Sequence, residues 1–135
     1  MAGVRVVVGG VAEGRVVVLD EPLSFWGGFS AEEGVVTDEH HPQAGVSLSG
    51  AVVVMTGARG SSSASSVLAE SVRLGTAPAA ILMQRPDEIL VTGALVAAEL
   101  YDRTVPIALL DDATFAQATE ARAARLSADG LLTLM

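Results

Sequence analysis

The chain has 135 residues, half of them apolar, which is enough for one domain with a real hydrophobic core. Its formal net charge is −8, which argues against nucleic-acid binding because phosphate neutralisation requires a basic face. Cysteine and lysine are absent, so this chain can supply no disulfide, thiolate nucleophile, thiolate-held iron–sulfur cluster or lysine Schiff base.

The first part of the chain predicts two valine-rich strands, at residues 4–8 and 14–19, separated by a glycine-bearing turn. Residues 20–50 predict one long loop, and a loop of this length in a small domain is usually functional or disordered. The loop contains three aromatic residues, Phe25, Trp26 and Phe29. Such side chains are stabilised by burial, which favours an ordered loop over a disordered one.

Residues 51–55 predict a buried strand that leads through glycines into a serine cluster and a helix. From residue 64, small and apolar residues recur at helical spacing, and Gly75 is a natural residue to end that helix. Short buried strands are predicted at 79–83 and 105–110, whereas residues 89–101 could form a strand or a helix after Gly93.

The end of the chain predicts a helix with an aspartate cap at 111–125 and a terminal hairpin at 126–134, around Asp129-Gly130. Strands followed by strand–helix alternation predict an α/β or α+β fold with a mixed sheet, as a single domain over residues 1–135. No apolar run reaches the roughly 20 residues of a membrane span, and the first residues lack the pattern of a secretory signal. We therefore expect a cytoplasmic protein without membrane or nucleic-acid partners.

A serine cluster is the most unusual feature of the sequence, with five serines within positions 61–66. Where a strand ends and a helix begins, unpaired N–H groups and the helix dipole together favour the binding of an anion, or the ionised (alkoxide) form of a hydroxyl held there. Gly57 and Gly60 would let the backbone approach a ligand closely. The alternative is that one serine caps the helix and the others have no function. The spacing is not that of a nucleophile elbow, so a hydrolase triad would require the loop of His40 and His41 to fold over the serines.

Other residues have competing interpretations. Because His40 and His41 are adjacent, their side chains diverge, which disfavours a shared metal and favours a role in ordering the loop. Thr92-Gly93 could form a second ligand-facing turn or simply cap a helix. A set of aromatic and glycine residues could line a pocket or a subunit interface, or be buried in the core: Phe25, Trp26, Gly27 and Gly28.

Four segments of the sequence together resemble a known family. "EPLSFWGG", "HPQAGVSLSG", "GARGSSSASSVL" and "APAAIL" resemble, in order and approximate spacing, the small subunit of aconitase X. The resemblance covers residues 9 to about 110 and implies a swivelling β/β/α domain, with mixed sheets and flanking helices. It also implies a hydro-lyase (dehydratase) that abstracts a proton beside a carboxylate and releases water.

The same resemblance implies Ser61 as the catalytic base, because the segment around it is similar to that of true aconitases. Ser63 stands where true aconitases carry a substrate-binding arginine, and Arg59 could take part of that role. A serine hydroxyl is a very weak acid, so the helix N-terminus, Arg59 and partner cations would have to stabilise its alkoxide. The groups expected to hold the substrate are Arg59, Gly60, Ser62, Ser63 and the backbone N–H groups of residues 63–65.

The resemblance further implies an iron–sulfur cluster that acts as a Lewis acid. We expect no cofactor or metal bound by this chain and a large partner subunit that holds the cluster, with the active site in the cleft between them. The absence of lysine and asparagine suggests a GC-rich bacterial genome, which favours cis-3-hydroxy-L-proline dehydratase over phosphomevalonate dehydratase. A non-catalytic anion-binding regulatory module is the alternative of a different class.

Overall fold

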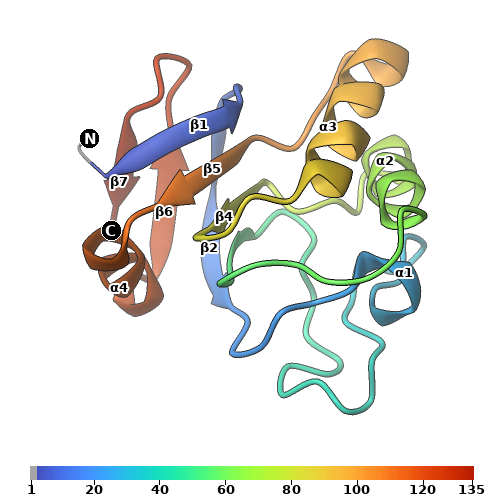
Figure 1. Cartoon of the computed structure of the whole chain (residues 1–135). Coiled ribbons are helices and arrows are strands. Elements are labelled where there is room, and N and C mark those ends of the chain that lie inside the picture. The colour runs from blue at the N-terminus through green and yellow to red at the C-terminus, as the bar shows by residue number, and fades with distance from the viewer. Residues whose placement is uncertain (1–2) are drawn as a thin grey trace.

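A computed structural model describes residues 3–135 and contains a mixed sheet of seven strands in the order β1-β5-β4-β3-β2-β6-β7 (Figure 1). Four adjacent strands, β2 to β5, run parallel, and β1, β6 and β7 pair antiparallel at the two ends. The strands are β1 (Val4–Val8), β2 (Ala12–Val18), β3 (Val52–Val54), β4 (Ala80–Met83), β5 (Ile107–Leu110), β6 (Ala123–Leu126) and β7 (Leu132–Leu134). The mixed α/β fold is therefore confirmed.

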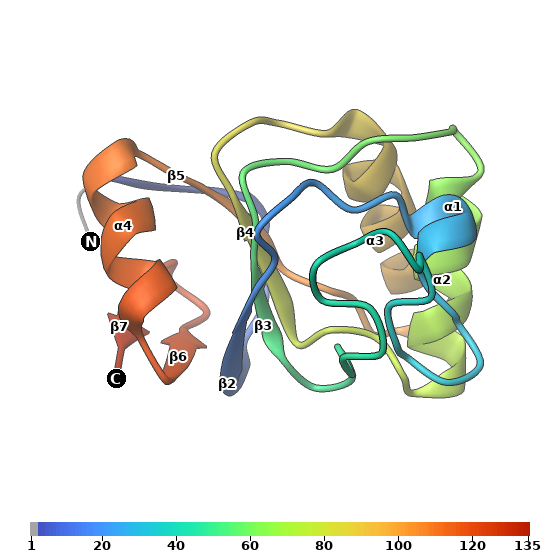
Figure 2. The same cartoon turned by 90° about the horizontal axis from the view of Figure 1, so that it is seen from below.

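Helices cover both faces of this sheet. Figure 2 shows α2 (Ala64–Leu74) and α3 (Glu88–Tyr101) on one side and α4 (Asp112–Glu120) on the other. The fourth helical element, α1 (Phe25–Gly28), is one distorted turn that lies against α2. Within residues 3–135, no helix has the length and apolar character needed to cross a membrane.

The central parallel strands β3 and β4 are buried on both sides, so they appear in the sequence as continuous apolar runs. Alternate side chains of β3 and β4 enter two separate cores. Val53 and Ile81 pack with α2 and α3, whereas Val54 and Leu82 pack with α4 and β6.

The helix predicted from residue 64 is confirmed as α2, with its buried face and its terminus. Leu68 and Val72 lie on the buried side, together with Ser71, whose hydroxyl donates to the Leu68 carbonyl (2.6 Å). Gly75 adopts a φ of +78°, and its N–H bonds to the carbonyls of the last turn.

The ambiguous segment 89–101 belongs to a helix, α3, because Asp87 provides an N-cap that accepts from the Leu90 N–H (2.9 Å). Gly93 lies in the middle of this helix and faces the backbone of α2, where an added Cβ would lie 2.6 Å from the Ser65 carbonyl oxygen. Both interpretations of Thr92-Gly93, as a ligand-facing turn and as a helix cap, are therefore wrong. Gly93 allows close helix packing instead.

The last predicted helix is too long. Its Asp111 cap is confirmed, with the Asp111 carboxylate accepting from the Thr114 N–H (2.8 Å), but the helix ends at Glu120. Ala123–Leu126 instead form strand β6 between β2 and β7. Alanine and arginine favour a helix locally, and cross-strand pairing overrides that preference here. The terminal hairpin is confirmed as β6 and β7.

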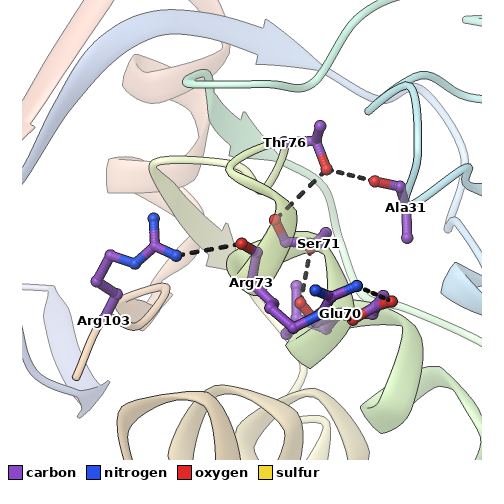
Figure 3. A network of polar contacts seen from close by, with 7 residues as sticks. Ala31, Glu70, Ser71, Arg73, Thr76 and Arg103 are labelled. Carbon is purple, nitrogen blue, oxygen red and sulfur yellow. Dashed lines mark hydrogen bonds and ion pairs between the residues drawn. The ribbon is translucent and has the colours of Figure 1, made fainter. Parts of the chain in front are cut away.

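The long loop between β2 and β3 is ordered by polar contacts with the end of α2 (Figure 3). Thr76 Oγ1 donates to the Ala31 carbonyl (2.5 Å), and Ser49 Oγ donates to the Thr76 carbonyl (2.9 Å). In the same network Arg73 donates two hydrogen bonds to Glu70, which lower the pKa of that carboxyl.

His41 fixes the other side of this loop. It is buried, its Nδ1 accepts from the Gln43 N–H (3.0 Å), and its Nε2 therefore carries the proton that bonds to the Glu21 carbonyl (2.9 Å). Both ring nitrogens are thus engaged in loop contacts, as expected of a loop-ordering residue. His40 is exposed. A hydrolase triad built on His41 is excluded because neither nitrogen is available to a serine.

Candidate active site

The serine cluster lies at the carboxyl edge of the parallel strands, where ligands bind in many α/β sheets. The segments that follow β3 and β4 meet there, because the Thr56 carbonyl accepts from the N–H groups of Gln84 (3.1 Å) and Arg85 (2.9 Å). Leu23 pairs with Ala58 in an isolated parallel bridge beside them. Three chain segments distant in sequence therefore converge at this edge.

Gly60 is the residue on which the geometry of this turn depends. Its φ is +119°, and a Cβ at this position would collide with the hydroxyl of Ser24. Ser24 is held in turn by a hydrogen bond to the Trp26 carbonyl (2.8 Å). The two most characteristic motifs of the sequence, around Trp26 and around Ser61, are thus packed against each other.

The serine hydroxyls have distinct partners. Ser61 is partly buried, and its Oγ accepts from the Ser63 N–H (3.1 Å), which closes the turn before the helix. Ser65 Oγ donates back to the Ser62 carbonyl (2.8 Å). Ser63, at the helix N-cap, makes no capping bond with its side chain. Conventional capping therefore does not explain the cluster, although Ser61 does have a structural bond.

The backbone donors at this turn differ from those expected. The N–H groups of residues 63–65 are all used, bonding to Ser61 Oγ, the Ser61 carbonyl and the Ser62 carbonyl. The expectation that they are free for a substrate is wrong, because the chain forms a tight turn before α2 begins. Within the described residues, it is the N–H groups of residues 60–62 that donate no hydrogen bond. Consecutive unbonded N–H groups next to a residue of positive φ are typical of an anion-binding concavity.

A shallow depression opens beside Ser61. Arg59, Gly60 and Ser61 contribute to its lining, together with Phe25 and Asp87 from neighbouring segments. Ser62 is exposed and Ser63 is partly buried at the start of the helix. The structure therefore brings the predicted base together with an arginine and a carboxylate.

The aromatic residues divide into two groups. Phe25 and Phe29 are buried in the main core, with their ring centroids 5.0 Å apart. Trp26 is 57% exposed, next to Gly27, which is also exposed and has a φ of +82°. Gly28 is buried against Leu23. The trio is therefore no single surface patch, and only Trp26 remains available to a partner.

Two residues near the turn were not identified from the sequence, Arg85 and Asp87. Both follow β4, the strand adjacent to β3, and a polar residue at that position is the signal that could have identified them. A larger groove shares Asp87 with the depression, but its walls are mostly apolar, including Met83, Val91 and Ile107. It offers few groups for acid–base chemistry, so the candidate site is the serine turn.

The donor set of this chain does not fit an iron–sulfur cluster. The sequence has no cysteine, and the part of the chain covered by the structure holds no group of three or more His, Asp or Glu side chains that could bind a metal ion. The chemistry of this turn must be derived from serine, arginine and backbone N–H groups.

Comparison with known proteins identifies relatives over most of the chain. The chain is 47% identical over 108 residues to cis-3-hydroxy-L-proline dehydratase of Pseudomonas aeruginosa, which covers 80% of this chain and 19% of that protein. It is 40% identical over 93 residues to the phosphomevalonate dehydratase small subunit of Thermococcus gammatolerans. This match covers 69% of this chain and 71% of that subunit. The chain thus spans about a fifth of the length of the first of these relatives.

Solved structures share the fold. The crystal structure of the holo-form of Thermococcus kodakaraensis aconitase X matches with a TM-score of 0.81 and 31% identity, over 97% of this chain and 95% of that one. The solution structure of a UPF0107 protein matches with a TM-score of 0.82 and 32% identity, over 98% of this chain and 97% of that one. The sequence profile of the aconitase X swivel domain covers residues 2–134. The chain belongs to the aconitase X swivel-domain family.

Proposed function

We propose that this chain is the small subunit of an aconitase X-type dehydratase and that Ser61 is its proton-abstracting base. The observation that carries the proposal is the position of Ser61 beside the unbonded N–H groups of residues 60–62, at the carboxyl edge of the sheet. These N–H groups are consecutive and begin at a glycine of positive φ, the pattern typical of an anion-binding concavity.

The proposed substrate is cis-3-hydroxy-L-proline, which carries a proton beside its carboxylate and a hydroxyl on the next carbon. Ser61 Oγ would remove that proton, and the hydroxyl would leave with a proton as water. The identity of 47% to a cis-3-hydroxy-L-proline dehydratase, against 40% to a phosphomevalonate dehydratase small subunit, supports this choice.

Ser61 needs help to act as a base because an unperturbed hydroxyl is almost fully protonated at neutral pH. Three features favour its alkoxide. The Ser63 N–H already donates to Ser61 Oγ, and a hydrogen bond donated to the charged form stabilises it. The start of α2 adds a positive end of a helix dipole, and Arg59 lines the same depression.

The remaining parts of the site would come from a large partner subunit. We propose that this partner carries the iron–sulfur cluster, which supplies Lewis acidity to the leaving hydroxyl. On this chain, Arg59 and the hydroxyls of Ser62 and Ser63 would contact the substrate, and Trp26 would lie at the subunit interface. Separate small subunits among the relatives support a heteromeric enzyme.

The proposal is tested by co-purification and a substrate screen. The chain is expected to bind a large cysteine-containing subunit, and the complex is expected to dehydrate cis-3-hydroxy-L-proline but not phosphomevalonate. If the complex dehydrates phosphomevalonate but not cis-3-hydroxy-L-proline, the proposed substrate is wrong. A complex, or a free chain, that binds anions without any dehydration would instead support the regulatory module.

A further inference from the structure

Arginine side chains in this structure fall into two classes. Of the eight arginines, four are engaged by hydrogen bonds or ion pairs within residues 3–135. The engaged ones are Arg15, Arg73, Arg103 and Arg125. The other four have no such partner among the described residues: Arg5, Arg59, Arg85 and Arg122. Of these, Arg59 lines the depression beside Ser61, and Arg85 lies against Gly57, on the segment that leads to the serine turn.

Arg85 is held against the segment that precedes that turn, by its backbone and by its side chain. Its N–H donates to the Thr56 carbonyl (2.9 Å), directly before Gly57. Its guanidinium lies against Gly57 so closely that a Cβ there would be 2.9 Å from both Nε and Nη2. The absence of a side chain at Gly57 is therefore what allows the guanidinium to lie along the segment that leads to Ser61.

Neither of the ion pairs among the described residues involves Arg85, and its guanidinium donates no hydrogen bond there, so its donors are open to a ligand. Arginine offers a planar pair of donors that matches a carboxylate, and such charge-assisted bonds are the strong ones. We propose that Arg85 binds the carboxylate of the substrate in the assembled enzyme, as a second cation besides Arg59. This inference rests on the proposed function of the same site.

Three variants test the role of Arg85. Arg85→Gln removes the charge. Gly57→Ala keeps the charge but displaces the guanidinium, and its cost to the fold is small because the three atoms nearest to the added methyl all belong to the flexible end of Arg85. Arg122→Gln is the matched control, since Arg122 is also exposed and unpaired within the described residues but follows α4, on the other face of the sheet.

In the assembled enzyme, we expect Arg85→Gln to lower kcat/KM for cis-3-hydroxy-L-proline by about 10- to 100-fold, the loss typical of a bond between charged groups. Gly57→Ala should also lower kcat/KM, whereas Arg122→Gln should leave kcat/KM unchanged. Binding of L-proline, measured by calorimetry, should weaken by a similar factor in Arg85→Gln, whereas binding of L-prolinamide, which lacks the carboxylate, should not change. A merely structural role of Arg85 would affect both ligands equally.

The calorimetric measurement separates this inference from the proposed function. If the wild-type assembly does not dehydrate cis-3-hydroxy-L-proline, the proposed function fails, but weaker binding of L-proline by Arg85→Gln would still support the inference. Equal affinity of the wild-type and Arg85→Gln assemblies for L-proline, including no detectable binding by either, would overturn it.

Discussion

Replacing Ser61 and Ser65 separately by alanine distinguishes catalysis from local structure. Each hydroxyl makes one hydrogen bond to the turn, at 3.1 Å for Ser61 and 2.8 Å for Ser65. Each substitution should therefore cost about 1 kcal/mol of stability, which corresponds to a fall in Tm of roughly 3–5 °C for a chain of this size. The two variants are thus matched in their structural cost.

Their rates should differ greatly. Loss of a general base typically lowers the rate by about 10²–10⁴-fold, which is about 3–5 kcal/mol in the activation barrier. We expect that loss for Ser61→Ala only, because Ser65 Oγ is directed back to the Ser62 carbonyl. The assay is steady-state turnover of cis-3-hydroxy-L-proline by each assembled variant, with Tm measured on the same samples. Near-normal turnover of Ser61→Ala with a lowered Tm would refute the reasoning, and the base would then lie on the partner.

Three further predictions concern the surroundings of the site. Adding the partner should shift the fluorescence of Trp26 to the blue because this side chain is 57% exposed in the free chain, and an unchanged spectrum would remove Trp26 from the interface. Phe25→Ala should destabilise the chain by about 3–5 kcal/mol in denaturant unfolding because the ring is fully buried, whereas Trp26→Ala should change stability by less than about 1 kcal/mol. The hydrogen bond from the Thr114 N–H lowers the pKa of Asp111 in the folded chain below its value in the unfolded chain. The stabilisation by this cap is therefore complete above the pKa of the unfolded chain, and it is lost as the pH falls through the pKa of the folded chain. The stability advantage of the wild type over Asp111→Asn, measured by urea unfolding, should therefore shrink below about pH 4, and a constant difference would contradict this assignment.

The local elements of the fold were largely predictable because they follow from short-range patterns. Gly75 ends α2 and Asp111 begins α4 as expected, since both signals act through neighbouring backbone groups. The end of α4 was not predictable, because Ala123–Leu126 have helical propensity and become a strand only through pairing with distant β2.

The candidate site was predictable only in part for the same reason. The serine turn is contiguous in sequence, so its motif alone pointed to Ser61 as a candidate. Arg85 follows the adjacent strand, β4, and its contact with Gly57 depends on the parallel pairing of β3 with β4. The free N–H groups of residues 60–62 depend on the turn before α2, which propensity alone does not define.

The most direct test of the central claim is turnover of cis-3-hydroxy-L-proline by the purified chain, alone and with its large partner. We expect no dehydration by the chain alone, because its serine turn lacks a complete acid–base set and its sequence has no cysteine. We expect dehydration by the complex. Measurable dehydration by the isolated chain would contradict the proposed function, and so would a lack of dehydration by a complex in which the proposed partner carries an intact iron–sulfur cluster.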